Sequence, residues 1–134
     1  AYEVALSLRQ EDRRELEEGH GIHPTHGLVL AAHRGCYAFK VPDGRIAGLA
    51  GNDDGQIWML CTEAIHDFPV TFAREAKRFI NRQPDKLLWN IADKRNTIHL
   101  KLLKFLGFTF LREVTHGPNN ITFIEFCKCV HQPL

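Results

Sequence analysis

Hydrophobic and polar residues follow one another along this chain in patterns that switch between helical and extended periods. Residues 4–18 carry an apolar stripe with arginine and glutamate on the other face, which is typical of an amphipathic helix. Gly19 is expected to end that helix, and the His-Pro-Thr-His-Gly sequence at 23–27 indicates a loop. Residues 28–34 fit a short helix or a strand equally well.

The middle of the chain predicts three strands connected by turns. Residues 36–41 are followed by a Pro-Asp-Gly-Arg turn and then by residues 46–51 as a hairpin partner. An Asn-Asp-Asp-Gly turn precedes Gln56–Cys61. The nearly continuous apolar run of this third strand predicts a central position in the sheet.

The C-terminal half alternates between helix and strand. We expect a helix over 72–83, a strand over 87–92, a helix over 97–106, and strands over 108–114 and 121–130. Helices between strands imply crossover connections, so the chain is predicted to be an α/β (α+β) protein with a mixed sheet. The strands over 56–61 and 87–92 are expected to be parallel neighbours that splay apart at their C-terminal ends.

Packing predictions follow from the same periodicity. The apolar face of the helix over 97–106 predicts that Leu102 and Phe105 are buried, and Phe108 is expected to enter the core just beyond that helix. Trp58 and Trp89 lie on the two predicted central strands and are expected to be core residues.

Length and composition favour a single globular domain over residues 1–134. The 134 residues are 44% hydrophobic and 25% charged, which are ordinary globular values. The formal net charge of +1 gives no reason to expect nucleic acid or an anionic membrane as a partner. The longest apolar runs are far shorter than the ~20 residues that a membrane span needs. No secretion signal opens the sequence, so we expect a protein that is not secreted.

Four cysteines occur without a C-x-x-C pair: Cys36, Cys61, Cys127 and Cys129. On a strand, Cys127 and Cys129 would point to the same face, as half of a metal site or as two buried reduced thiols. No second pair accompanies them, so we favour buried thiols and a reducing compartment.

The most informative segment is 88–108, which reads as strand, Asn-containing loop, helix, Gly-Phe and strand. Asn96 is a good N-cap residue, and Gly107 can take the left-handed conformation that ends a helix. This segment resembles the signature of the GNAT fold of acetyl-CoA-dependent N-acyltransferases, in which an Asn opens the fourth helix and a Gly-Phe pair closes it.

The wider pattern narrows the resemblance. It comprises L-R-x-x-D-x-x-E at 8–15, I-W-M-L-C-T at 57–62, L-W-N at 88–90, R-N at 95–96 and L-x-x-L-G-F at 103–108. Together these are similar to a GNAT-like protein family of short-tailed bacteriophages that includes an internal virion protein. The resemblance implies a mixed, mostly antiparallel sheet flanked by helices, with the family's first strand missing from this sequence. It also implies a location in the phage virion or host bacterial cytoplasm, with other virion or host proteins as partners.

The resemblance also shows a departure at the cofactor loop. In active GNAT enzymes, a glycine-containing loop between the fourth strand and third helix holds the acetyl-CoA diphosphate. The equivalent residues 65–72 contain no glycine, Pro69 lacks an N–H, and Asp67 is an anion. The position of the family's tyrosine general acid is Leu103, which cannot transfer a proton. We therefore expect a non-catalytic protein without a cofactor, acting through protein–protein contacts in virion assembly or within the virion.

The second hypothesis is an active acetyl-CoA-dependent N-acetyltransferase that acts on a host amine or protein. Its candidate catalytic residues are Glu63 and His66, although exposed loop side chains are the favoured interpretation of both. Cys61 could serve as an acyl acceptor, but its position on an apolar strand favours a buried core thiol. The cofactor-binding candidates are Leu60, Thr62, Asn90 and Asn96.

Two further clusters have a functional and a structural interpretation. His20, His23 and His26 have a spacing that suits metal ligation, but no carboxylate or cysteine close in sequence completes a site. A bare loop is favoured there, and no metal is expected. Lys94 and Arg95, at a helix start, either attract phosphate or form a solvated basic turn, and the turn is favoured.

Overall fold

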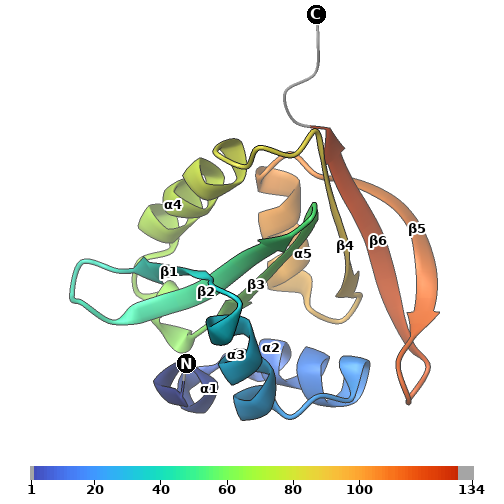
Figure 1. Cartoon of the computed structure of the whole chain (residues 1–134), viewed down its shortest axis with the longest axis horizontal. Helices are drawn as coiled ribbons and strands as arrows, with labels where there is room; N and C mark the ends of the chain where they lie inside the picture. Colours follow the sequence, from blue (N-terminus) through green and yellow to red (C-terminus); the bar gives the residue numbers. More distant parts are fainter. Residues whose placement is uncertain (1, 130–134) are drawn as a thin grey trace, which may run out of the picture.

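The computed structural model of the chain describes residues 2–129, apart from the side chains of residues 2, 3 and 5. Its centre is a six-stranded sheet in the order β1-β2-β3-β4-β6-β5 (Figure 1). Only β3 and β4 pair in parallel, which confirms the mixed, mostly antiparallel sheet. The strands are β1 (Tyr37–Lys40), β2 (Ile46–Asp53), β3 (Gln56–Cys61), β4 (Leu87–Asp93), β5 (Thr109–His116) and β6 (Ile121–Cys129).

Helices cover both faces of this sheet. On one face, α4 (Pro69–Asn81) and α5 (Thr97–Phe105) enclose a buried cluster that includes Phe72, Leu88 and Leu103. On the other face, a smaller cluster joins Leu28 of the N-terminal helices to Leu49 and Leu60 of the sheet. Among residues 2–129, no helix is long and apolar enough to cross a membrane. The N-terminal elements are α1 (Tyr2–Ser7), α2 (Gln10–Arg14), the π-helical turn η1 (Glu15–His20) and α3 (Pro24–His33).

The prediction of a single helix over residues 4–18 is wrong. Leu8 interrupts it by forming an antiparallel bridge with Thr62, and the Arg9 N–H donates to the Cys61 carbonyl at 3.0 Å. The helical path also continues past Gly19 to His20, and the lack of a side chain at Gly19 leaves room for the Phe123 ring. The N-terminal segment thus bends to reach the end of β3.

The loop expected over 23–27 is also wrong, since α3 begins at Pro24. Proline is well suited to the first position of a helix, where the missing N–H has no intrahelical partner. The same helix settles the ambiguity of residues 28–34 in favour of helix as far as His33.

β3 and β4 diverge as predicted. Their parallel pairing is limited to Gln56 opposite Trp89, and beyond that pair the strands separate (Figure 1). Asn90 donates from Nδ2 to the Ile57 carbonyl at 2.7 Å, so a side chain spans the start of the gap. The open end of this splay positions the candidate site.

The helical face of α5 differs from the expected one. Leu103 and Leu106 are buried, Leu102 is partly buried, and Phe105 is 51% exposed with the Lys77 ammonium 5.3 Å from its ring centroid. Apolar residues occupy most of this short helix, so the sequence pattern does not select one face. Phe108 is buried as predicted.

Part of the sheet remains uncovered on the face of the N-terminal helices. Trp89 is 41% exposed there, which corrects its assignment to the core, whereas Trp58 is partly buried against the smaller cluster. Cys127 pairs with Trp89 and is only partly buried, and Cys129 is exposed. The expected burial of these two thiols is therefore wrong, because the N-terminal layer does not extend over this end of β4 and β6.

Candidate functional site

The diverging ends of β3 and β4 are joined by two carboxyl groups from the N-terminal helices. Asp12 Oδ2 accepts the Cys61 N–H at 2.9 Å, and Glu15 Oε1 accepts the Asp93 N–H at 2.8 Å. Asp12 and Glu15 are three residues apart, which places both on the same helical face. A strand ladder cannot satisfy these two amides across the splay, so the helix satisfies them instead.

Arg9, Asp12 and Asn96 form a buried polar cluster beside this junction. Asp12 Oδ1 accepts from Arg9 at 3.2 Å and from Asn96 Nδ2 at 2.8 Å, and Asn96 Oδ1 accepts from Arg9 at 2.9 Å. Each of the three side chains is 1% exposed. Asn96 occupies the N-cap position of α5 as predicted, but its side chain makes no capping bond because the cluster uses it. The cluster ties the N-terminal helices to the start of α5.

Glu15 and Asp93 are in contact, but the pKa values of their carboxyl groups are shifted in opposite directions. Burial raises the pKa of Glu15 to about 8, although its bond from the Asp93 N–H opposes that shift. Burial also acts to raise the pKa of Asp93, but its bonds from Arg95 and the charge of Arg95 bring it below its usual value. At neutral pH, Glu15 is therefore protonated and Asp93 is ionised.

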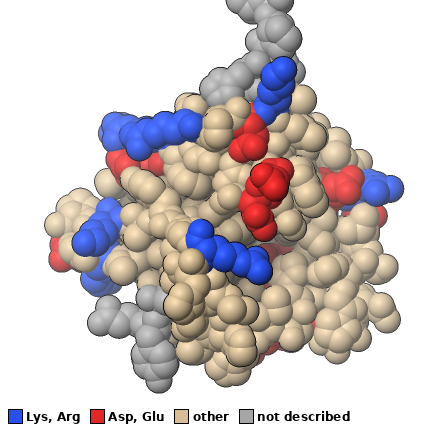
Figure 2. Space-filling view, viewed as in Figure 1, with Lys and Arg blue, Asp and Glu red and all other residues tan. Residues whose placement is uncertain are grey.

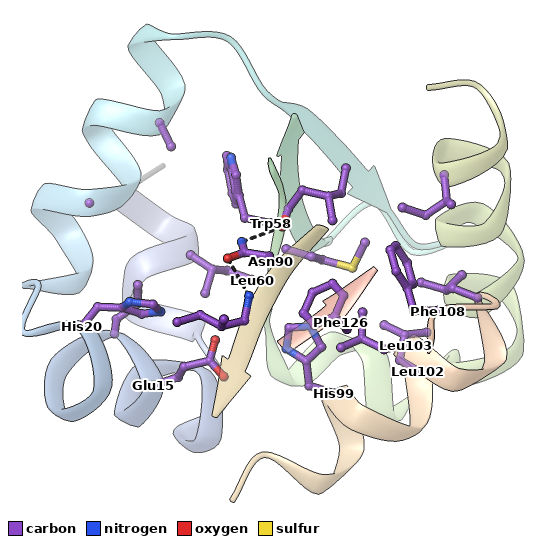
Figure 3. Close-up of a pocket in the computed structure, with 18 of the residues that line it drawn as sticks. Glu15, His20, Trp58, Leu60, Asn90, His99, Leu102, Leu103, Phe108 and Phe126 are labelled. Carbon is purple, nitrogen blue, oxygen red and sulfur yellow. Dashed lines mark hydrogen bonds between the residues drawn. The ribbon is translucent and has the colours of Figure 1, made fainter. Parts of the chain in front are cut away.

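A cavity of about 220 Å³ lies where the two strands diverge (Figure 3). Glu15 and His20 approach it from η1, and His99 approaches it from α5. Burial lowers the pKa values of both His20 and His99. The rest of the wall is mainly apolar and includes Trp58, Leu60, Leu102, Leu103, Phe108 and Phe126.

The candidate cofactor residues fall into two groups. Leu60 and Asn90 line the cavity, whereas Thr62 and Asn96 lie beside it and are fully bonded within the protein. The Thr62 hydroxyl donates to the Ile46 carbonyl at 2.8 Å. Leu103, at the position of the family's general acid, also lines the cavity.

Glu63 and His66 lie away from the cavity. Both are exposed on η2 (Glu63–His66), a short 3-10 helix after β3, and His66 Nε2 lies 3.2 Å from Glu63 Oε2. Cys61 is buried, and burial raises the pKa of its thiol well above its usual value. A protonated buried thiol is a poor nucleophile.

The loop that replaces the glycine-rich loop bonds to itself. The N–H groups of Ile65 and Asp67 donate to the carbonyls of Thr62 and Ala64 at 3.3 and 3.2 Å. The Asp67 carboxylate accepts from Arg45 at 2.7 Å. Pro69 begins α4 and brings no N–H to its first turn. The segment therefore presents an anion and few amide donors at the start of α4.

The histidine and basic clusters are dispersed. His20 Nδ1 lies 3.0 Å from His116 Nε2, while His23 and His26 are exposed, and the described residues contain no group suited to a metal ion. Arg95 is held by Asp93 and Glu18, and Lys94 by Glu113. The basic turn is thus neutralised by neighbouring acids.

Sequence reasoning did not assign roles to Arg9, Asp12, Glu15 and His99. The L-R-x-x-D-x-x-E pattern contained a usable signal, because Arg9, Asp12 and Glu15 are spaced three residues apart on one face. These residues were instead interpreted as part of a solvated charged face, because charged residues also fill the neighbouring positions.

Comparison with known proteins bears on the fold. No protein-family model matches the chain, and no curated protein matches it in sequence. A GNAT-family acetyltransferase from Bacillus anthracis superposes with a TM-score of 0.62 at 6% identity, covering 80% of this chain and 73% of that one. A GNAT-family acetyltransferase from Bacillus cereus gives a TM-score of 0.61 at 12% identity, covering 98% and 94%. The fold is that of the GNAT acetyltransferases.

A third similar structure is a chimera of the spermidine N-acetyltransferase from Vibrio cholerae. Its TM-score is 0.60 at 9% identity, and the match covers 92% of this chain and 93% of that one. The structural similarity establishes a GNAT-like fold. At sequence identities this low, the activity has to be argued from the chemistry of the site.

Proposed function

We propose that this chain is a non-catalytic GNAT-like protein that acts through protein–protein contacts, in the assembly of a phage virion or within it. The phage part of the proposal rests on the sequence patterns at 8–15, 57–62, 88–90, 95–96 and 103–108. The non-catalytic part rests on the segment between β3 and α4.

That segment is the observation that carries the proposal. A diphosphate needs several amide donors aimed at one point, together with a favourable charge. Here the amides of Ile65 and Asp67 are used inside the loop, Pro69 has none, and Asp67 adds a negative charge that Arg45 only partly offsets. These features disfavour acetyl-CoA binding.

The uncovered part of the sheet supports a role in protein contacts. Leu87 and Trp89 are 47% and 41% exposed, and both point to the face on which Cys127 and Cys129 lie. An exposed tryptophan among apolar neighbours is typical of a contact surface. Figure 2 shows charges of both signs dispersed over the visible face, without the basic patch that nucleic acid would favour.

An activity assay tests the proposal against an acetyltransferase. The purified protein is incubated with acetyl-CoA and a panel of amines and peptides, and free thiol is measured. We expect no release above the rate without protein. Glu63 and His66 are the candidate catalytic bases of the N-acetyltransferase. Turnover that is lost in Glu63→Gln or His66→Gln would overturn the proposal and favour that enzyme.

A second experiment tests the virion role. Particles of a phage that carries this coding sequence are purified and probed for the chain by mass spectrometry, and the same is done for a Trp89→Ser phage. We expect the wild-type chain in the particles, or in assembly intermediates, and less of the variant. Absence of the wild-type chain from both the particles and the assembly intermediates would contradict the virion role.

A further inference from the structure

The cavity between β3, β4 and α5 has the size and lining of a small-molecule site. Its volume is about 220 Å³, and an apolar cavity of about 150 Å³ is already large enough to bind benzene. Phe108 and Phe126 form an edge-to-face pair in its wall, with ring centroids 5.1 Å apart. An aromatic ligand could extend this arrangement, since rings prefer edge-to-face or offset contacts.

The polar groups at the wall are uncharged at neutral pH. The pKa of Glu15 is raised to about 8, and those of His20 and His99 are lowered, in each case chiefly by burial. No lysine or arginine lines the cavity within the part of the chain that the structure describes. An anionic ligand would therefore find no counter-charge, and an ammonium would have to lose its hydration and ionise Glu15.

A groove adjoins this cavity on the side of α3. Histidines and charged residues line its outer part, including His23, His26, Arg34 and Asp53. The groove and the cavity share the wall residues Leu16, His20, Ile22, Gly27, Ala31, Trp58 and Asn90. The polar groove and the apolar cavity therefore adjoin at these residues.

We propose that this cavity binds a small uncharged aromatic molecule of about eight non-hydrogen atoms that carries one hydroxyl group. The ring lies among Leu102, Phe108 and Phe126, and the hydroxyl exchanges hydrogen bonds with the neutral groups of Glu15 or His99. This binding goes beyond the protein contacts proposed above and does not require acetyl-CoA.

Three probes that share a benzyl or phenyl ring test the charge preference. Benzyl alcohol, benzylamine and benzoate are titrated at pH 7 into Trp89→Phe protein, in which Trp58 at the cavity wall reports binding by fluorescence. We expect benzyl alcohol to bind with a Kd below about 1 mM and the two ions at least tenfold more weakly. Equal or tighter binding of either ion, or no binding of the alcohol at several millimolar, would overturn the proposal.

Two adjacent positions on α3 provide a matched pair. Ala31 lines the cavity and its groove, whereas Ala32 is exposed and lines neither. We expect Ala31→Phe to weaken benzyl alcohol binding at least tenfold and Ala32→Phe to leave it unchanged. Unchanged affinity in a folded Ala31→Phe protein would place the ligand elsewhere and contradict the proposal.

The pH dependence locates the hydroxyl without relying on a cavity-filling variant. A neutral ligand favours protonated Glu15, so its affinity should be constant from pH 6 to 7.5 and fall above about pH 8. Glu15→Gln keeps an acceptor for the Asp93 N–H and cannot ionise, so its affinity should stay constant throughout. A fall that is the same in both proteins would show that Glu15 does not face the ligand and would overturn the proposal.

Discussion

Asp12 and Asn96 are joined by a 2.8 Å hydrogen bond although they lie 84 positions apart in sequence. The same carboxylate accepts the Cys61 amide from the end of β3 and pairs with Arg9. One buried side chain thus connects the N-terminal helices, the splayed strand and the start of α5. The GNAT-like splay is held open by this cluster on one side and by Glu15 on the other.

Removal of the Asp12 carboxylate should strongly destabilise the protein. Asp12→Ala removes the buried ion-pair partner of the Arg9 guanidinium and leaves only the more exposed Glu11 at 3.5 Å, so we expect a loss of about 3–5 kcal/mol in the free energy of unfolding. Urea denaturation measures this loss. The double variant Arg9→Met/Asp12→Ala should recover part of it, because no unpaired charge remains. A loss below about 1 kcal/mol for Asp12→Ala would show that the cluster is not a structural junction.

Glu15 should make the stability fall as the pH rises. Its folded pKa of about 8 lies above its unfolded value of 4.5, so its contribution is fully present below pH 4.5 and is lost as the pH rises through 8. The stability of Glu15→Gln minus that of wild type should therefore increase between pH 5 and 8, by up to about 1.4 kcal/mol per pH unit. Urea titrations of both proteins at four pH values measure the difference, and a constant difference would refute the assigned pKa shift.

His20 should have the opposite effect on stability. Burial, followed by the nearby His116, lowers the pKa of His20 from 6.5. The folded state therefore resists protonation of His20. The contribution of His20 to the free energy of unfolding should be present above pH 6.5 and be lost as the pH falls below that value. His20→Gln should reduce this acid sensitivity when thermal unfolding is followed from pH 7.5 to 5. Identical pH profiles for the two proteins would contradict the prediction.

The two sides of α5 should respond differently to truncation. Leu103 is buried in the main cluster, so Leu103→Ala should cost about 2–5 kcal/mol. Phe105 is exposed, so Phe105→Ala should cost less than about 1 kcal/mol, mainly from its contact with Lys77. Denaturant unfolding of both variants compares the two faces, and a larger loss at Phe105 would restore the face predicted from sequence.

Much of the fold could be predicted because its signals are local. The turns before and after β2, the Gly107 cap and the helix between β3 and β4 are encoded within a few residues, and Gly107 indeed has φ of 92°. The parallel pairing and the splay followed from the crossover through α4. These features required no knowledge of which distant side chains meet.

The site was harder to predict because its contacts are distant in sequence. Arg9 and Asp12 look like solvated helix residues until Asn96 is placed beside them. The same limitation explains Trp89, whose burial depends on how far the N-terminal helices extend across the sheet. Periodicity describes one element at a time, whereas these outcomes depend on how separate elements pack.

Isothermal titration with acetyl-CoA tests the central claim most directly. Loss of two or three charge-assisted hydrogen bonds to the diphosphate, at ~1.5–3 kcal/mol each, would weaken binding by roughly two to six orders of magnitude. With the amides of Ile65 and Asp67 used internally and the Asp67 carboxylate beside them, we expect a dissociation constant of about 1 mM or weaker. A dissociation constant in the low micromolar range would contradict the account and show that this GNAT-like chain retains a cofactor site.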